Sequence, residues 1–142
     1  LYGPGDQRLD PHRQHAANGM VMRALIARKA GVPFTAMGSG GAVRSWAYVD
    51  DVAKLLVTKL DPQTWPVNVP HSHSTSMARL AADVATAVGV ELGPTPAPDL
   101  VAVADHKVID DWGFQMRHGE QAWTPWQVGL QATVRWYEEH GP

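Results

Sequence analysis

The sequence predicts an α/β fold, and three observations indicate it. Segments with strand-like composition alternate with segments of helical periodicity, an order typical of α/β and α+β domains. Glycine and proline residues separate most of these segments, as expected for turns between regular elements. The chain has 142 residues, of which 44% are hydrophobic, and this suffices for one globular unit with a modest core.

The N-terminal part of the chain predicts two helices. After a loop over residues 1–17, Asn18 is a suitable N-cap for a helix that runs to about residue 30, where Gly31 stops it. Asp50 caps a second helix, which continues to about residue 60 with apolar residues at helical spacing. Asp50 and Asp51 point about 100° apart on such a helix, so capping is favoured over an acid–base pair.

Two further helices are expected in the middle of the chain. Ser74 or Thr75 opens the clearest one, which presents an apolar stripe and is closed by Gly89. Residues 89–98 contain three prolines and read as a connection. A short helix is then expected over residues 105–112, ended by Gly113.

The last helix is expected over residues 124–139, with Thr124 as its cap and Pro125 at its first position. Short apolar stretches between the helices indicate strands. The expected strands are 33–37, 45–49 and 67–69.

Composition excludes several functional classes. A net charge of −2 gives no broad basic field, so nucleic acid is not an expected partner. The sequence has no apolar run near 18 residues and no charged-then-apolar leader, so we expect a cytoplasmic protein that does not enter a membrane. Without cysteine, the chain forms no disulfide, thiolate nucleophile or cysteine-based zinc site.

The segment 38–41, Gly-Ser-Gly-Gly, allows two interpretations. It is either a plain turn or a loop close to a phosphate, and it lacks the Lys-Ser/Thr of a P-loop. Arg44 follows it, and a guanidinium there can bind two phosphate oxygens or form a structural salt bridge. The seven histidines include pairs at 12/15 and 71/73, but neither has a third ligand at convincing spacing, so no metal site is expected.

These motifs, in their order along the chain, resemble a known family. Residues 1–5 read Leu-Tyr-Gly-Pro-Gly, and residues 38–51 join the glycine-rich turn, an arginine and a Tyr-Val-x-Asp helix start. Residues 105–114 and 124–137 are similar to two further family segments. The resembled family is that of the extended short-chain dehydrogenase/reductases, the NAD-dependent sugar-nucleotide epimerases and dehydratases, and within it the GDP-fucose-synthase-like reductase/epimerases.

The resemblance implies a fold and a domain arrangement. Residues 1–142 would form the C-terminal, substrate-binding half of such an enzyme: a small mixed α/β domain plus edge elements of a Rossmann sheet. We expect the Rossmann cofactor-binding half to be absent. The sequence has neither the Gly-x-x-Gly-x-x-Gly turn nor the Tyr-x-x-x-Lys pair that the family uses. NAD or NADP is therefore expected only if that other half is supplied, and this chain alone should bind neither.

The resemblance also implies a site for a nucleoside-diphosphate sugar. Arg44 would contact the diphosphate. The expected substrate-binding residues are Asn18, Arg44, Trp46, Asp105 and Lys107. In the fucose-synthase-like branch an Asp-Pro-x-x-x-His stretch supplies a catalytic histidine, and residues 10–15 fit that pattern, which makes His15 a candidate proton donor. The alternative interpretation is a surface-loop histidine without a catalytic role.

Two functions follow as expectations. The first is binding of a nucleoside-diphosphate sugar within an NAD(P)-dependent epimerase, dehydratase or 4-keto-6-deoxysugar reductase, completed by a separate Rossmann half. The second is a non-catalytic binding or dimerisation domain, left by truncation or gene fission, with an apolar surface that associates with a second copy. An uncovered sheet edge would leave the isolated chain marginally stable or self-associating.

Overall fold

A computed structural model gives the fold, and it describes residues 1–6, 14–37, 40–59, 68–69, 71, 73–94 and 106–141. Five helices and three short strands form a mixed α/β unit, which confirms the predicted fold class. The elements are α1 (Ala16–Ala30), β1 (Val43–Trp46), α2 (Val49–Lys59), β2 (His73–Ser76), α3 (Met77–Val88), β3 (His106–Lys107), α4 (Trp112–His118) and α5 (Trp126–His140).

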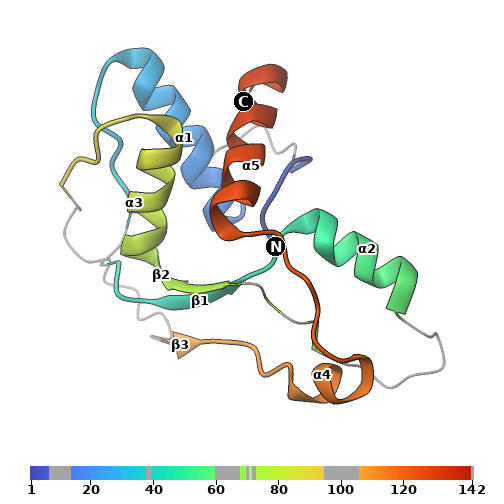
Figure 1. The fold of residues 1–142 in the computed structure, drawn as a ribbon. Helices are drawn as coiled ribbons and strands as arrows, with labels where there is room; N and C mark the ends of the chain where they lie inside the picture. The colour runs from blue at the N-terminus through green and yellow to red at the C-terminus, as the bar shows by residue number, and fades with distance from the viewer. Residues whose placement is uncertain are drawn as a thin grey trace.

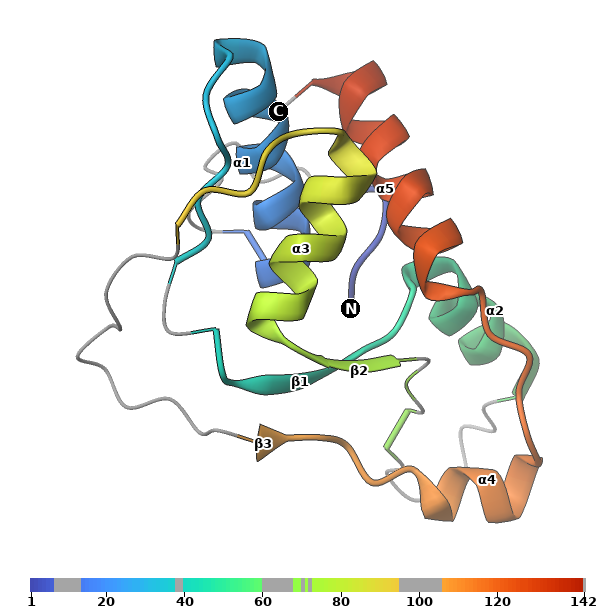
Figure 2. The ribbon, with the colours of Figure 1, turned by 60° about the vertical axis from the view of Figure 1, so that its left-hand side comes forward.

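Helices α1, α3 and α5 pack together over one side of the sheet and contain most of the core (Figures 1 and 2). Helix α3 has the apolar stripe that the sequence predicts, with Leu80 and Val84 fully buried and Gly89 in the left-handed conformation that ends it. Arg28 of α1 joins the three helices, donating to the carbonyl oxygen of Val88 at 2.9 Å and to Glu138 Oε1 at 2.7 Å.

The sheet has the strand order β2-β1-β3. Strands β1 and β2 are antiparallel, and Trp46 lies opposite His73. Strands β1 and β3 are parallel over two residue pairs, Val43 with His106 and Arg44 with Lys107. Helices α2 and α4 lie outside the three-helix layer: α2 lies beside the N-terminal end of α5, and α4 lies toward the β3 side of the molecule (Figure 2).

The predicted start of the third helix was wrong. Residues 74–76 belong to β2, because they pair with β1, and α3 begins only at Met77. Ser76 is the N-cap, and its hydroxyl accepts from the Arg79 backbone N–H at 3.2 Å.

The short helix expected over residues 105–112 was also wrong. Residues 106–107 form β3, the next helix begins at Trp112, and Gly113 lies inside that helix instead of ending it. Residues 106–107 pair with β1 instead of forming a helix, because a short segment has little helical preference of its own.

Several boundaries differ from the prediction. The strand expected over 33–37 is a single bridge between Phe34 and Leu92, and the one expected over 45–49 begins earlier and ends at Trp46. Asn68 and Val69 are not in a strand, and residue 67 lies outside the described residues. The helix N-termini are also shifted: α1 has His15 as N-cap, α2 begins at Val49, and α5 has Pro125 as N-cap.

Candidate functional site

The N-terminal turn, residues 1–6, lies between the end of β1 and helix α5. Tyr2 donates its N–H to Ala47 O at 3.0 Å and accepts from Val49 N at 2.9 Å, so the turn is paired like a strand with the segment after β1. Its ring is 2% exposed and lies 4.7 Å, centroid to centroid, from the Trp126 ring. Burial raises the pKa of the Tyr2 hydroxyl.

Gly3 is required where this turn meets α2. Its φ of +135° lies in a region that side chains disfavour. A Cβ added there would also lie 2.5 Å from Val49 Cγ1. The glycine in the Leu-Tyr-Gly-Pro-Gly motif therefore has a local steric reason.

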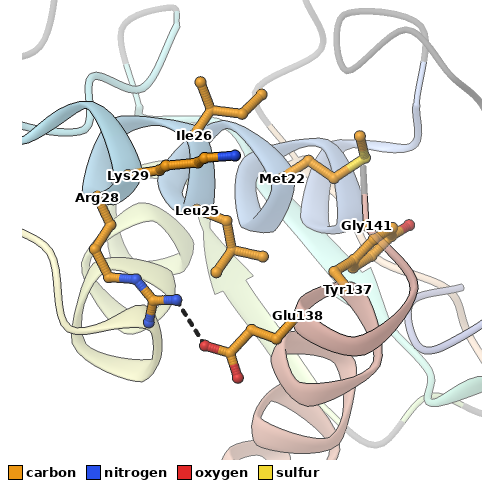
Figure 3. Close-up of a pocket in the computed structure, with 8 residues that line it drawn as sticks. All are labelled: Met22, Leu25, Ile26, Arg28, Lys29, Tyr137, Glu138 and Gly141. Carbon is orange, nitrogen blue, oxygen red and sulfur yellow. Dashed lines mark hydrogen bonds and ion pairs between the residues drawn. The ribbon is translucent and has the colours of Figure 1, made fainter.

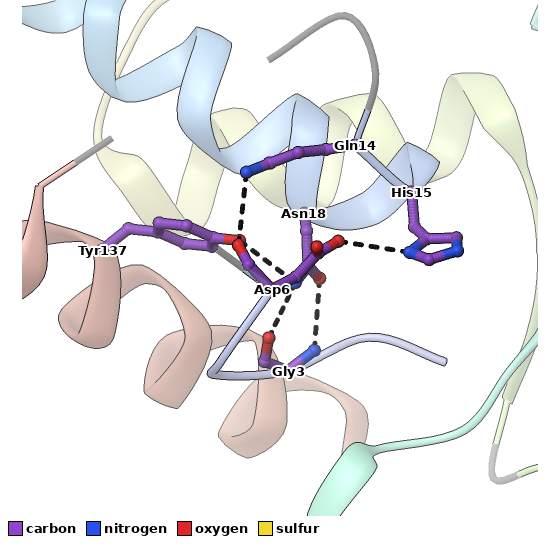
Figure 4. A network of polar contacts seen from close by, with 6 residues as sticks. All are labelled: Gly3, Asp6, Gln14, His15, Asn18 and Tyr137. Carbon is purple, nitrogen blue, oxygen red and sulfur yellow. Dashed lines mark hydrogen bonds and ion pairs between the residues drawn. The ribbon is translucent and has the colours of Figure 1, made fainter. Parts of the chain in front are cut away.

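Asn18 holds this turn to two helices (Figure 4). Its side-chain amide donates to Gly3 O at 2.7 Å and accepts from Gly3 N at 3.2 Å. The same Nδ2 donates to the Tyr137 hydroxyl at 3.2 Å. Asn18 is 3% exposed and lies inside α1, so its predicted role as an N-cap was wrong: its side chain bonds the turn instead of its own helix.

Tyr137 of α5 continues this network to Asp6. Its hydroxyl donates to the Asp6 carbonyl oxygen at 2.7 Å, and burial raises its pKa. Gln14 Nε2 donates to the same carbonyl at 3.3 Å. Two side chains, one from just before α1 and one from α5, therefore fix the backbone of Asp6 (Figure 4).

His15, the predicted proton donor, lies next to the Asp6 carboxylate. Its Nδ1 is 3.2 Å from Asp6 Oδ2. The His15 side chain is 65% exposed and that of Asp6 only 19%. Both residues line a hollow of about 240 Å³, together with the N-terminal turn, Asn18 and Val49. The arrangement suits proton transfer to a ligand, with the carboxylate behind the imidazole.

The other predicted site residues lie on or near the sheet. Arg44 and Lys107 are neighbours across the parallel β1–β3 pair, although 63 positions (107 − 44) separate them in sequence. Arg44 is half-buried, and its Nη1 donates to Val43 O at 2.7 Å. Trp46 is 6% exposed and part of the core. Asp105 lies outside the described residues.

Opposite Trp46, a ring of β2 stacks on a ring of α5. His73 stacks on Trp126 with ring centroids 4.8 Å apart, and Trp126 Nε1 donates to Asp83 Oδ2 at 2.9 Å. Burial lowers the pKa of His73, against the opposing influence of Asp83. This group anchors the start of α5 to the sheet.

The arrangement of the acidic and histidine side chains bears on the metal and acid–base alternatives. In the described part of the chain, no group of three or more His, Asp or Glu side chains could hold a metal ion. Asp51 accepts from the Thr124 N–H and from its hydroxyl, both at 2.8 Å, so this carboxylate joins α2 to the segment before α5.

Among the described helices, none combines the length and apolarity needed to cross a bilayer.

A larger hollow, of about 510 Å³, opens between α1 and α5 (Figure 3). Met22, Leu25 and Ile26 give it an apolar wall, and the Arg28–Glu138 ion pair lies at its side. None of the predicted site residues lines it.

Sequence reasoning missed Asp6 and Tyr137. Asp6 follows the turn motif directly, and its place one residue beyond Leu-Tyr-Gly-Pro-Gly was a usable signal. Tyr137 belongs to the last predicted helix, and nothing local in the sequence links it to residue 6.

Comparison with known proteins gives matches in one enzyme group. The family model of the NAD-dependent epimerase/dehydratase family matches residues 1–68. A trifunctional UDP-glucose 4,6-dehydratase, epimerase and reductase of Arabidopsis thaliana is 26% identical over 126 residues, which cover 85% of this chain and 19% of that protein.

Solved structures share the fold. A GDP-L-fucose synthetase from Naegleria fowleri superposes with a TM-score of 0.85 at 22% identity, covering 98% of this chain and 43% of that one. The UDP-glucose 4-epimerase of Thermus thermophilus, in complex with NAD, has a TM-score of 0.74 at 26% identity, covering 96% and 43%. The chain thus spans less than half the length of these relatives. By its fold and by these matches, the chain is similar to the NAD-dependent epimerases and dehydratases of the extended short-chain dehydrogenase/reductases.

Proposed function

We propose that residues 1–142 are the substrate-binding portion of an NAD(P)-dependent sugar-nucleotide epimerase, dehydratase or 4-keto-6-deoxysugar reductase, and that they bind a nucleoside-diphosphate sugar. The similar proteins support this class of ligand. An epimerase from Thermotoga maritima was solved with UDP-glucose, and one from Methanobrevibacter ruminantium with UDP-N-acetylmuramic acid. Their folds match this chain with TM-scores of 0.70 and 0.76.

The observation that carries the proposal is the pairing of Arg44 with Lys107. Residues directly opposite on adjacent strands project from the same face, so the register brings two cationic side chains together. Like charges in such a position repel each other and are destabilising by themselves. A diphosphate between them would remove that repulsion. The contact to Val43 O uses one of the five N–H groups of the guanidinium.

The remaining site residues would have different roles. Asn18 and Trp46 are buried and would act by holding the backbone of the site in place. Asp105 is two positions from Lys107 and would contact the nucleotide near it. His15, with an exposed side chain, would exchange a proton with the sugar.

The strand-to-helix junctions of the described residues bear on where a nicotinamide cofactor would bind. In that part of the chain, a helix follows a strand closely in two places, β1 to α2 and β2 to α3. Neither junction has the glycine-rich turn that admits a pyrophosphate at a helix N-terminus. In the proposed arrangement, a complementary Rossmann half binds the NAD or NADP.

Calorimetric titration with UDP-glucose and with GDP tests the proposal, with the Rossmann half added if one is identified. Arg44→Ala should weaken binding about ten- to a hundredfold, since a charge-assisted contact contributes about 1.5–3 kcal/mol. Arg117→Ala removes the same charge from an exposed position on α4 and is the control. Equal affinities of the two variants would refute the role of Arg44.

Exposed apolar side chains favour the second candidate, a dimerisation domain. Trp112 and Met116 on α4 are 67% and 70% exposed, and Val57 on α2 is 87% exposed. Such residues on two outer helices suit an interface. Sedimentation at micromolar concentration distinguishes the candidates: a dimer that Met116→Glu dissociates supports self-association, whereas a monomer with sugar-nucleotide affinity supports the substrate-binding role.

A further inference from the structure

Asp6 and His15 form a close carboxylate–imidazole pair at the N-terminal turn. His15 Nδ1 faces Asp6 Oδ2 at 3.2 Å, and the second ring nitrogen lies on the edge directed away from Asp6 (Figure 4). The carboxylate is the more enclosed partner, with 19% of its side chain exposed against 65% for the imidazole. The pair thus has a fixed inner member and an accessible outer one.

The inner member is held through its backbone. The Asp6 carbonyl oxygen accepts from the Tyr137 hydroxyl and from Gln14 Nε2. Tyr137 in turn accepts from Asn18, which also bonds both backbone groups of Gly3. These contacts use the carbonyl oxygen, and the carboxylate of the same residue lies 3.2 Å from His15 Nδ1.

The chemistry of the two groups then determines where the proton lies. An ionised carboxylate only accepts hydrogen bonds, whereas a neutral imidazole has one donor and one acceptor nitrogen. Nδ1 must therefore carry the hydrogen when the ring is neutral, and Nε2 keeps its lone pair. When Nε2 takes a proton from a ligand group, the electron pair stays on the ligand, the ring becomes an imidazolium, and the neighbouring carboxylate stabilises its charge.

We infer that Asp6 is a positioning residue for His15: it fixes the Nδ1–H tautomer and leaves Nε2 to exchange the proton with a ligand. The catalytic meaning of this inference rests on the proposed function. The tautomer does not, because it is a property of the chain without any ligand.

Nitrogen-15 spectra of the histidine rings test the inference on the full chain at about two pH units above the ordinary imidazole pKa, where the rings are neutral. His15→Gln identifies the His15 signals by their loss. The Nδ1–H form should predominate in the unaltered chain, and Asp6→Asn, which keeps the backbone carbonyl, should lower its fraction at least about twofold.

Two comparisons keep the test specific. Glu120→Gln removes a carboxylate from an exposed position and should leave the His15 signals unchanged. His140, whose Nδ1 lies 2.8 Å from the Trp136 carbonyl oxygen, should be unaffected by Asp6→Asn and reports that α5 remains folded. A predominant Nε2–H form in the unaltered chain, or the same tautomer in Asp6→Asn with intact His140 signals, would overturn the inference.

The outcome is separable from that of the proposed function. Binding of UDP-glucose depends on the Arg44 and Lys107 side of the molecule and is measured by titration. A chain that shows the Asp6-dependent tautomer but binds no sugar nucleotide would refute the proposed function and leave the positioning role in place. A chain that binds the ligand without that tautomer would refute the positioning role and leave the proposed function in place.

Discussion

The N-terminal turn and the β1–β3 edge both contain proposed site residues, but the fold holds them in different ways. The turn is fixed by buried hydrogen bonds from Asn18 and Tyr137, which come from two helices. The edge consists of two residue pairs between β1 and β3, and both residues of β3 are exposed. The cation pair of the proposed diphosphate site therefore lies on the less constrained region.

This difference indicates a division of tasks. Buried hydrogen bonds are costly to remove because the remaining partner loses both its bond and its water, whereas exposed groups regain water. A proton-transferring pair needs fixed geometry, which the turn supplies. A phosphate contact depends mainly on charge and tolerates some movement. Substitutions in the two regions should therefore have unequal effects on stability.

The largest effect is expected for Asn18→Ala, which breaks the turn. It removes the partners of Gly3 N and O, both buried, and one contact to Tyr137. We expect a loss of about 3 kcal/mol in the free energy of unfolding, measured by urea denaturation. Asn68→Ala is the matched control, because its exposed amide donates to Asp110 O, and its loss should stay below about 1 kcal/mol. Equal losses would show that the turn is not the better-held region.

Gly129→Ala tests the packing of α5 on the turn. A Cβ there would lie 2.5 Å from the Tyr2 hydroxyl oxygen and 3.0 Å from Tyr48 Cδ2, both on buried rings. Overpacking of this kind should cost about 2 kcal/mol, in spite of the better helix propensity of alanine.

Gly113→Ala provides the control for that substitution. A Cβ at Gly113 meets no atom within 4 Å, so the change should stabilise α4 slightly. The two substitutions should shift the thermal midpoint in opposite directions. A gain in stability for Gly129→Ala would contradict the close approach of α5 and Tyr2.

A pH-dependent effect is expected on the sheet side, at His73. Burial lowers its pKa below the ordinary value of 6.5, so between these two values the unfolded chain binds more protons than the folded chain. The stability contributed by neutral His73 is therefore present above pH 6.5 and is lost as the pH falls below it. His73→Phe keeps a ring against Trp126 without the titration. Its melting midpoint should fall less between about pH 7.5 and about pH 5.5 than that of the unaltered chain.

The smallest loss in the free energy of unfolding is expected for Ser45→Ala, near the β1–β3 edge. The Ser45 hydroxyl accepts from Ile109 N at 3.0 Å in an exposed setting and helps hold the segment after β3. Its loss should cost about 0.5 kcal/mol, because water replaces the hydroxyl. Hydrogen exchange at Ile109 should nevertheless become faster. A loss as large as that of Asn18→Ala would remove the contrast between the two regions.

The sequence by itself determined the features that depend on local periodicity. The apolar stripe and Gly89 predicted the body and the end of α3, and the apolar spacing after Asp50 predicted α2. The motif around residues 1–5 and Arg44 indicated the family whose fold the structure shares. In each case neighbouring residues contain the information, because helices are stabilised by contacts three and four positions apart.

Only the tertiary structure decided what depends on distant partners. Strands β2 and β3 pair with β1, whereas the sequence had predicted helical residues in both segments. The sequence predicted Asn18 as a helix cap, whereas in the structure its side chain bonds Gly3 and Tyr137. The pairings of Arg44 with Lys107 and of Tyr137 with Asp6 join positions far apart in the sequence. No local pattern encodes such pairings, since they arise when the packing of α1, α3 and α5 closes the long loops between them.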